Sequence, residues 1–443
     1  MFKRWGVVLR SVAVVGSLAS LACLGFVAGC GVVPDGDGNG TNACTGNPCD
    51  DGNPCTTDTC TVDAAAEEGY TCTYADVECD EGFVCDEATG ECVEAAVPGP
   101  AETFPGSLHD GNFRGMEYFY SADQGGFEVV TNVPYDDLGC KNCHDASRFE
   151  NADPPVEWPG TDSCANCHED LTDPAAGITD DLCLGCHGRQ KTEAGFFTDV
   201  HRDAGFTCMR CHLLSEVHGD GTEYDSIHES PSPACEDCHV EGGTGAAPPA
   251  NSYHSTHLET VDCSACHVQS VISCYNCHFE SELAGAGKRA VSKLQGFKML
   301  VNFEDKVQTA TFQSLVYAQE PFYAIAPYYA HSVTNGENVT CGDCHLPGNA
   351  AVQEYDDEGT ITVATFAEGA LQGPVGVIPI PADYADALYF DFVDYTGDAT
   401  TPIADTDPTL WELLDAGPPE TQMLFCTPLT DEQMSKLSLP VGG

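Results

Sequence analysis

Cys183-Leu-Gly-Cys186-His187 is one of eight Cys-x-x-Cys-His motifs that lie between residues 140 and 345. The paired cysteines of the eight motifs are, in chain order, Cys140 and Cys143, Cys164 and Cys167, Cys183 and Cys186, Cys208 and Cys211, Cys235 and Cys238, Cys263 and Cys266, Cys274 and Cys277, and Cys341 and Cys344. The histidines that close them are His144, His168, His187, His212, His239, His267, His278 and His345. This repeated triplet organises the middle half of the chain.

The spacing within each motif predicts covalent haem attachment. Two thiols three positions apart can bond to the two vinyl groups of one porphyrin, and the adjacent imidazole then reaches the iron. A zinc site would not need a histidine after every cysteine pair. We therefore predict eight haem c groups, with the eight motif histidines as proximal iron ligands.

The density of motifs predicts a fold class. Residues 140–345 are too few to wrap eight porphyrins in separate cores. We expect a mostly irregular chain with short α-helices wrapped around a stack of haems, and minor β content near residues 296–330 and in the C-terminal segment. The haems after His267 and at Cys274 are expected to be neighbours, because only six residues separate the two motifs.

Histidines outside the motifs are candidates for the distal iron ligands. There are seven of them: His109, His201, His218, His228, His254, His257 and His331. Bis-histidine ligation saturates the iron and suits electron transfer. Because seven histidines serve eight irons, one iron needs Met116, Met209, Met299, a lysine, a water or a histidine from a second copy of the chain. If its sixth position is open instead, a small substrate could bind there.

The N-terminus has the pattern of an export signal. Lys3, Arg4 and Arg10 precede a run of apolar and small residues that ends in Val27-Ala28-Gly29-Cys30. This ending resembles a lipobox, which implies cleavage after residue 29 and a lipid on Cys30; a plain secretory signal or a short membrane anchor is the alternative. Residues 1–29 are thus predicted to be a lipoprotein signal peptide and residues 30–43 a flexible tether.

Residues 44–93 form a cysteine-rich module with almost no aliphatic side chains. Its eight cysteines predict four disulfides of open connectivity: Cys44, Cys49, Cys55, Cys60, Cys72, Cys79, Cys85 and Cys92. The module resembles the small cysteine-rich repeats of bacterial and slime-mould surface proteins, which implies a spacer or adhesion role. Oxygen atoms suited to Ca²⁺ are offered by Asp50, Asp51, Asn53 and Asp58, although a solvated turn explains them as well.

The remaining chain is divided into an octahaem domain at residues 94–345 and a C-terminal segment at residues 346–443. Residues 298–312 predict a β-hairpin with Glu304-Asp305 at its turn, inside an insertion at about 296–330. Aromatic residues that we expect over porphyrin faces follow it: Tyr317, Phe322, Tyr323, Tyr328 and Tyr329. Strands are expected at 360–366 and 389–393 and a short helix at 408–415, and Cys426 is the odd cysteine of the exported chain.

Charge limits the possible partners. The chain has a formal net charge of −54 with only 16 Lys and Arg residues. Such a charge argues against binding nucleic acid and against docking to anionic lipid through a basic patch. Membrane contact is therefore expected through the N-terminal lipid alone.

Residues 109–345 resemble the multihaem cytochrome c superfamily of metal- and sulfur-respiring bacteria, on the strength of the eight motifs and the interspersed histidines. Octahaem hydroxylamine oxidoreductases and tetrathionate reductases would imply a catalytic haem, whereas all eight motifs here end in His and none has the Cys-x-x-Cys-Lys of octahaem nitrite reductases. The lipobox and the cysteine-rich module are more similar to outer-surface respiratory cytochromes.

Two functions follow from this resemblance. The first, which makes the chain an electron carrier rather than an enzyme, is a relay between other redox proteins and a mineral or other extracellular acceptor. It places the chain outside the cytoplasm, lipid-anchored at the outer membrane and facing the periplasm or the exterior. The second is a terminal reductase of a small oxyanion or sulfur compound, but basic residues that could attract an anion are scarce near the motifs: Lys141, Arg148, Arg189, Lys191, Arg202 and Arg210.

Overall fold

The computed structural model describes residues 44–79, 83–86, 88–94, 99–105, 107–109, 117–120, 122, 125–134, 137–138, 164, 167–168, 173–224, 226–286, 292–337, 339–367, 370–402 and 405–439. Several predicted features lie outside these residues: the signal peptide, the lipidation site Cys30, the tether, the first motif (Cys140, Cys143 and His144), Met116, Lys141 and Arg148. The chain divides into two compact units, Met1–Val97 and Pro98–Gly443. None of the described helices is long and apolar enough to cross a membrane.

The N-terminal unit consists of two small hairpins joined by disulfides. Strand β1 (Thr56–Val62) pairs with β2 (Tyr70–Asp76), and β3 (Phe83–Cys85) pairs with β4 (Cys92–Glu94). The prediction that the eight cysteines form disulfides is confirmed, and the pairs are Cys44–Cys60, Cys49–Cys72, Cys55–Cys85 and Cys79–Cys92. Because Cys49 is the only hydrophobic side chain buried among the described residues of this unit, the disulfides take the place of a core.

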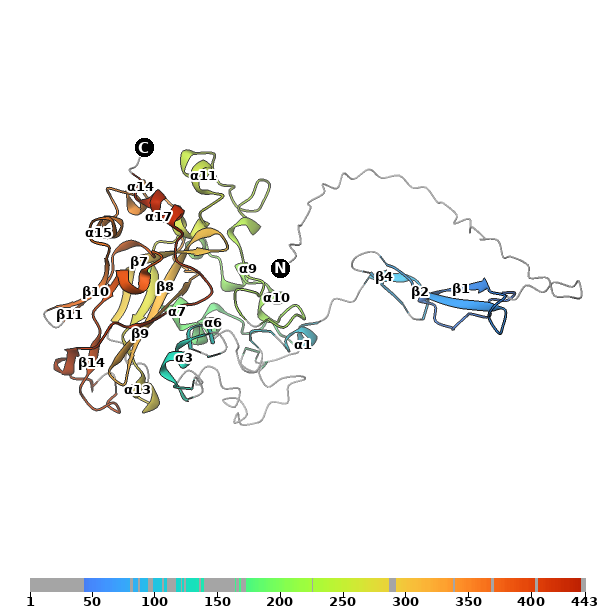
Figure 1. Ribbon diagram of the computed structural model, residues 1–443, viewed down its shortest axis with the longest axis horizontal. Coiled ribbons are helices and arrows are strands. Elements are labelled where there is room, and N and C mark those ends of the chain that lie inside the picture. The colour runs from blue at the N-terminus through green and yellow to red at the C-terminus, as the bar shows by residue number, and fades with distance from the viewer. Residues whose placement is uncertain are drawn as a thin grey trace, which may run out of the picture. The chain divides into compact units, whose positions relative to one another are not determined.

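The second unit is built around a seven-stranded sheet (Figure 1). Its central path has the order β12-β7-β8-β9-β16, and two short strands join it, β5 to β7 and β6 to β8. The bounds are β5 (Val271–Tyr275), β6 (Cys277–His278), β7 (Ser292–Phe303), β8 (Lys306–Tyr317), β9 (Glu320–Pro327), β12 (Gly376–Pro379) and β16 (Glu420–Met423). Edge strands β12 and β16 run parallel to β7 and β9 and come from the far C-terminal part of the chain.

The central strands are joined by tight turns. Phe303 pairs with Lys306 across Glu304 and Asp305, whose φ angles are 49° and 65°. Two consecutive residues with positive φ are the signature of the turn that fits the right-handed twist of a hairpin. The predicted hairpin at residues 298–312 is therefore confirmed, with its turn at the expected dipeptide.

Both faces of the sheet are buried. Along β9, Tyr323 and Ile325 belong to one hydrophobic cluster, whereas Phe322 and Ala324 belong to another, as expected when successive side chains of a strand point to opposite faces. The first cluster includes residues of β10 (Ile361–Ala367) and β13 (Leu388–Phe390), and the second includes α2 (Glu117–Tyr120), α3 (Phe127–Thr131) and α13 (Phe279–Leu283). The main apolar core of this unit is thus made by side chains of the sheet.

The predicted fold class is wrong in its balance. A mostly irregular chain with minor β content was expected, but a seven-stranded sheet dominates the second unit. Two features hide this sheet from sequence analysis. Strands that are buried on both faces lack the alternation of apolar and polar residues. Strands β12 and β16 pair with strands far away in the sequence, which leaves no local pattern. The remaining strands form small sheets: β10 with β11 (Ala370–Gln372) and β13, and β14 (Val393–Tyr395) with β15 (Trp411–Leu413).

The strand expected at 360–366 is confirmed as β10. The stretch 389–393 is divided between the ends of β13 and β14, and the helix expected at 408–415 is wrong: a 3-10 turn at Pro408–Leu410 leads directly into β15.

Short helices fill the region beside the sheet (Figure 1). They are α1 (Pro100–Thr103), α6 (Asp180–Cys186), α7 (Gly188–Phe196), α8 (Val200–Asp203), α9 (Cys208–Cys211), α10 (Leu214–Val217), η4 (Cys235–Asp237), α11 (Ser252–His257) and α12 (Cys263–His267). Near the C-terminus lie α14 (Cys341–Cys344), α15 (Ala350–Glu358), α16 (Tyr384–Ala387) and α17 (Asp431–Leu437).

Candidate functional site: paired imidazoles at the motifs

Six of the seven motifs within the described residues adopt the same local conformation. In each, the histidine N–H donates to the carbonyl of the first cysteine four residues earlier, the bond that closes one turn of a helix; it is 2.9 Å long from His187 to Cys183 and from His345 to Cys341. The others are the motifs that end at His168, His212, His239 and His267. Such a turn brings positions i and i+3 within about 5–6 Å of each other, so both thiols and the imidazole lie beside one surface.

The imidazole of each of these six motifs faces the imidazole of one histidine outside the motifs. The ring centroids are 5.9 to 6.2 Å apart. The pairs, motif histidine first, are His168 with His218, His187 with His109, His212 with His331, His239 with His201, His267 with His254, and His345 with His257. Six of the seven predicted distal histidines are thus each placed opposite one motif histidine.

Hydrogen bonds at the outer nitrogen orient many of these rings. Nδ1 of His267 lies 3.0 Å from the carbonyl of Thr334, and Nδ1 of His239 lies 2.8 Å from that of Ala246. Since a carbonyl can only accept, Nδ1 carries the hydrogen and Nε2 keeps its lone pair. The same arrangement holds His168, His254, His257 and His345.

Burial keeps other members of the set neutral. Burial, with a smaller contribution from His187, lowers the pKa of His109 to about 4, and burial also lowers the pKa of His187, His218 and His331. A neutral imidazole is the form that binds a metal ion.

The separation within each pair matches a metal ion held between two imidazoles. With metal–nitrogen bonds of about 2.0–2.1 Å on both sides, the ring centroids would lie about 6.3 Å apart. In the pairs of His254 with His267 and of His257 with His345, both Nδ1 atoms donate to backbone carbonyls. Both Nε2 atoms then carry only lone pairs, so no direct hydrogen bond can join the two rings. In each of the six pairs, the geometry therefore fits a metal ion held between two imidazoles.

The region around these pairs has no apolar core of its own. Among the described residues between Leu138 and Ala265, no hydrophobic side chain is buried. Large side chains are exposed instead: Phe196, Val200, Phe206, Leu213, Leu214, Val240, Tyr253 and Leu258. A segment of this length cannot offset its conformational entropy without burying apolar surface, so these exposed side chains indicate that something else covers them.

The sites lie close to one another. Sulfur or oxygen atoms of Cys235, Glu236 and Cys263, from two successive motifs, lie within 4.8 Å of one another. Helix α11 carries both His254 and His257, which face the histidines of the sixth and the eighth motif. These contacts make neighbours of the fifth and sixth sites and of the sixth and eighth sites.

The seventh motif has a different conformation. Cys274 lies in strand β5 and Cys277-His278 forms strand β6, so no helical turn brings the three side chains together. His278 is 3% exposed, and its ring packs against Trp411 at 5.0 Å between centroids. The expectation that the haems of the sixth and seventh motifs are neighbours stays a prediction.

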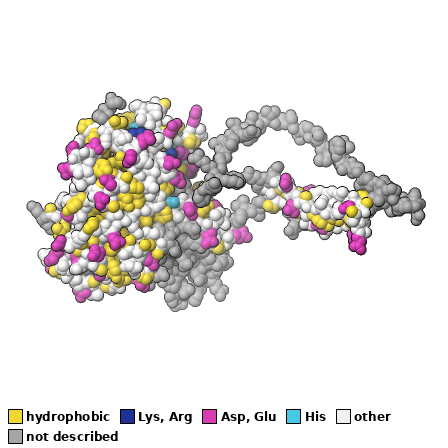
Figure 2. Space-filling view, in the orientation of Figure 1, with side chains coloured by type: hydrophobic (Ala, Val, Ile, Leu, Met, Phe, Trp, Pro, Cys, Tyr) yellow, Lys and Arg dark blue, Asp and Glu magenta, His cyan; other side chains and the backbone are white. Residues whose placement is uncertain are grey.

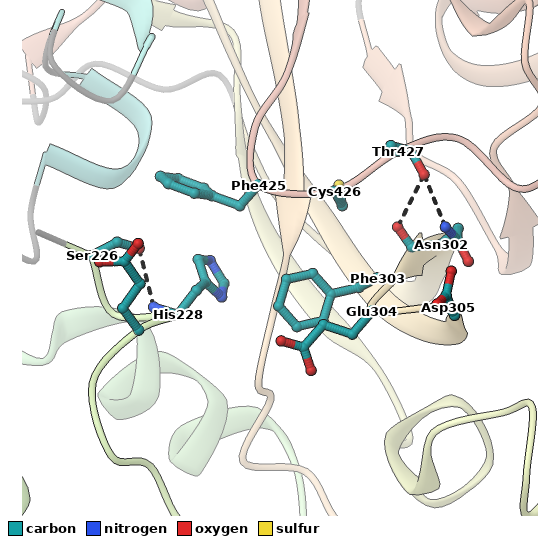
Figure 3. A pocket seen from close by; sticks show the side chains of 10 residues that line it. Ser226, His228, Asn302, Phe303, Glu304, Asp305, Phe425, Cys426 and Thr427 are labelled. Carbon is teal, nitrogen blue, oxygen red and sulfur yellow. Dashed lines mark hydrogen bonds between the residues drawn. The ribbon is translucent and has the colours of Figure 1, made fainter. Parts of the chain in front are cut away.

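His228 is the remaining candidate distal ligand and lines a cavity of about 780 Å³. Its imidazole points toward Phe425 and Phe303, with ring centroids 4.8 and 5.2 Å away (Figure 3). Cys426 lines the same cavity. Burial lowers the pKa of His228 to about 4.

Most of the other candidates have structural roles. Met299 is fully buried in the core of the sheet, and Met209 lies in α9 between the two cysteines of its own motif. Of the aromatic residues expected over porphyrins, Phe322 and Tyr323 are buried in the sheet. Asp51 accepts hydrogen bonds from the N–H of Asn53 and the hydroxyl of Thr56, which describes a self-bonded turn.

Three of the basic residues near the motifs, all arginines, contact other groups of the protein. Arg189 donates to the carbonyl of Ile272 and to Gln313, and Arg202 donates to the carbonyl of Phe197. Arg210 lies over the ring of Phe206 at 5.4 Å. These three guanidinium groups thus bind the protein's own groups.

Sequence reasoning missed the carbonyl groups that orient the rings and the strand conformation of the seventh motif. Backbone acceptors leave no mark in a sequence. The run Val271-Ile272 directly before Ser273-Cys274 was an available signal, because β-branched residues favour a strand. Comparison with family models, with curated proteins and with solved structures gave no match.

Proposed function

We propose that this chain is a multihaem c-type electron-transfer protein, in which each imidazole pair provides both axial ligands of one haem. The observation that carries the proposal is the set of six pairs, each of which joins one motif histidine to one histidine outside the motifs at 5.9 to 6.2 Å. Chance packing of surface histidines would not select one partner of each kind six times. Haem iron, when bound, supplies reversible one-electron exchange.

The residues of the chain would attach, orient and shield the cofactor. The two cysteines of each helical turn supply thiols for attachment, and the Nδ1 hydrogen bonds direct Nε2 toward the iron and make it a better donor. Exposed apolar side chains such as Phe206 and Leu213 would cover the porphyrin faces and become buried. The cofactors would thereby complete the core that this region lacks.

Complete axial ligation favours a relay over a reductase. An iron that holds two imidazoles has no position for a substrate. Three arginines near the motifs, Arg189, Arg202 and Arg210, bind groups of the protein itself, which leaves them poorly placed to hold an anion. A terminal reductase of an oxyanion or sulfur compound is therefore the weaker proposal.

The surface suits a cationic partner. Asp and Glu side chains are scattered over the visible face in Figure 2, with few Lys or Arg among them. A negative surface attracts a basic redox protein and speeds its docking at low salt. We propose export, lipid attachment at Cys30 and a location at the outer membrane, from the N-terminal sequence and the disulfide module.

The test is to produce the full chain with its own leader in a bacterium that matures exported c-type cytochromes. We expect the visible spectrum of haem c, an intact mass raised by several haems, and low-spin electron paramagnetic resonance signals that sulfite or nitrite leaves unchanged. A folded chain without covalent haem would refute the proposal. Binding of either anion to a high-spin haem would favour the reductase.

Paired variants sharpen this test. His331→Ala should convert one haem to a high-spin form, since His331 faces His212 at 6.1 Å. The control is Val375→Ala, which shortens a side chain that is 85% exposed and should leave all spectra unchanged. Equal spectra for both variants would contradict the assignment of His331 as a ligand.

A further inference from the structure

The seventh motif, Cys274-Tyr275-Asn276-Cys277-His278, is built into the sheet. Four of its five residues are at most 3% exposed, whereas in the six helical motifs the cysteines are exposed or half-buried. Cys277 pairs with Leu315 and His278 with Val316 in register with strand β8. The motif therefore lies in the interior of the unit, on a strand, and not at the surface of a helical turn.

The two residues between the cysteines bind the C-terminal segment. The Tyr275 hydroxyl donates to the carbonyl of Asp391. The Asn276 side chain donates to the carbonyl of Val393 at 2.6 Å and accepts from the N–H of Val393 at 2.8 Å. A φ of 60° at Asn276, a value that asparagine tolerates better than most residues, aims this side chain at its partner.

The histidine is engaged at the nitrogen that would bind iron. Nε2 of His278 lies 3.3 Å from the same Val393 carbonyl, and Nδ1 lies 3.7 Å from a carboxylate oxygen of Asp394. The ring of Trp411 packs edge-to-face against the imidazole, with ring centroids 5.0 Å apart. A haem at this motif would have to displace Trp411 and break the bonds to Val393.

We propose that the seventh motif is a structural clasp that carries no haem, and that the mature protein binds seven haems. This inference rests on the proposed function and deepens it. The side chains of the seventh motif bind the backbone of Asp391 and Val393 and thereby hold β14 and the residues before it against the sheet. The thioether and iron bonds of a haem are incompatible with this packing.

The number of histidines agrees with this assignment. The chain has 15 histidines, of which seven lie outside the motifs, and seven motifs remain when the seventh is set aside. Six of the resulting pairs are described; the histidines left over are His228 and His144, which lies outside the described residues. With seven distal candidates for seven irons, no methionine or second copy of the chain is needed to complete the set.

The first experiment measures the intact mass of the holoprotein and maps its peptides. We expect a mass gain of seven haems, and a proteolytic peptide that contains residues 274–278 without haem and with alkylatable thiols. A gain of eight haems, or haem on that peptide, would overturn the inference and leave the proposed function intact. A chain with no covalent haem would overturn the proposed function instead.

The second experiment compares two double variants. C274S/C277S should retain the full haem content and the unchanged low-spin spectrum, because serine keeps the size and the backbone bonds of this strand. The matched control, C263S/C266S, alters a helical motif and should lose one haem per chain. Loss of one haem in both variants would refute the clasp; if C274S/C277S does not fold, the peptide map of the wild-type protein still decides.

Discussion

His257 and His345 face each other with ring centroids 6.2 Å apart, and a backbone carbonyl holds the outer nitrogen of each ring. The carbonyl that holds His345 belongs to Lys436 in helix α17, at a Nδ1–oxygen distance of 2.8 Å. The far C-terminus thus orients a ligand of the last motif. Three helices therefore form this pair: α11 carries His257, α14 ends directly before His345, and α17 holds the ring of His345.

Replacing one distal imidazole by a thioether should change one reduction potential. His257→Met keeps a neutral ligand opposite His345 but stabilises the reduced iron, so the potential of one haem should rise. A potentiometric titration followed in the visible spectrum would show one component shifted upward and the others in place. The comparison variant is His228→Met, which makes the same replacement at the remaining candidate distal ligand. A uniform shift of all components would argue for a global structural change instead.

The carboxylate beside His212 should lower the potential of that site. Oε2 of Glu216 lies 2.9 Å from Nδ1 of His212, and a charged acceptor makes the imidazole a stronger donor to iron. Glu216→Gln weakens this bond by about 1 kcal/mol, which corresponds to about 40 mV for one electron. We expect one component to rise by that amount in the titration, while Glu223→Gln leaves it unchanged. A downward shift would contradict the assigned role.

Glu193 should make the second unit less stable as the pH rises. Its side chain is fully buried, and burial raises its pKa to about 7, against the opposing effects of the His331 backbone N–H and of Arg189 and Arg202. Between pH 4.5 and 7 the unfolded chain loses this proton while the folded chain keeps it, so the free energy of unfolding falls over that range.

The size of this effect can be measured with an isosteric variant. Glu193→Gln should match the wild type at pH 4 and exceed its free energy of unfolding by about 3 kcal/mol above pH 7. Urea denaturation at several pH values gives both curves. Parallel curves over the whole range would show that Glu193 does not ionise as its burial implies.

Cys426 should be an unreactive thiol. Burial raises its pKa to about 12, so its thiolate fraction at pH 8 is lower by a factor of about 1000 than that of an ordinary cysteine. Iodoacetamide should label it slowly in the native protein and quickly in urea, as followed by peptide mass. Fast labelling in the native state would mean that the cavity beside His228 opens readily.

The disulfide Cys49–Cys72 should determine whether the N-terminal unit folds. It closes a loop with a sequence separation of 23, and its removal should cost about 3 kcal/mol in a unit that has almost no apolar core. The double variant C49A/C72A should be cleaved rapidly by protease within residues 44–94, while the haem spectrum stays the same. Removal of the disulfide Cys79–Cys92, which closes a shorter loop with a sequence separation of 13, should lower the stability of the unit less.

The sequence predicted features that depend on nearby residues better than it predicted the overall arrangement of helices and strands. The hairpin at Glu304-Asp305 and the disulfide module depend on neighbours in the chain, and both are confirmed. The predicted proportion of helix and strand was wrong. Strands β12 (residues 376–379) and β16 (residues 420–423) pair with strands far away in the sequence, and no local sequence pattern predicts such a pairing. The motifs named the candidate ligands, but the pairing of His212 with His331 depends on the sheet that carries residue 331 into place.

The seventh motif shows a limit of motif reading. Its two cysteines and its histidine have the same spacing as in the other motifs. What distinguishes it is the strand-forming residues before it and its contacts with Val393 and Trp411. Those partners lie more than a hundred residues further along the chain. A motif states what a segment could bind, whereas the packing around it decides what the segment does bind.

Helix α11 sets the spacing of two sites with a single turn. His254 and His257 project from the same six-residue helix toward His267 and His345. One turn of helix rises about 5 Å, so a helix and not a loop fixes the distance between these two histidines. If the proposed haems bind at these two pairs, a motion of the helix would displace both of them together, and the tunnelling distance between them would change little.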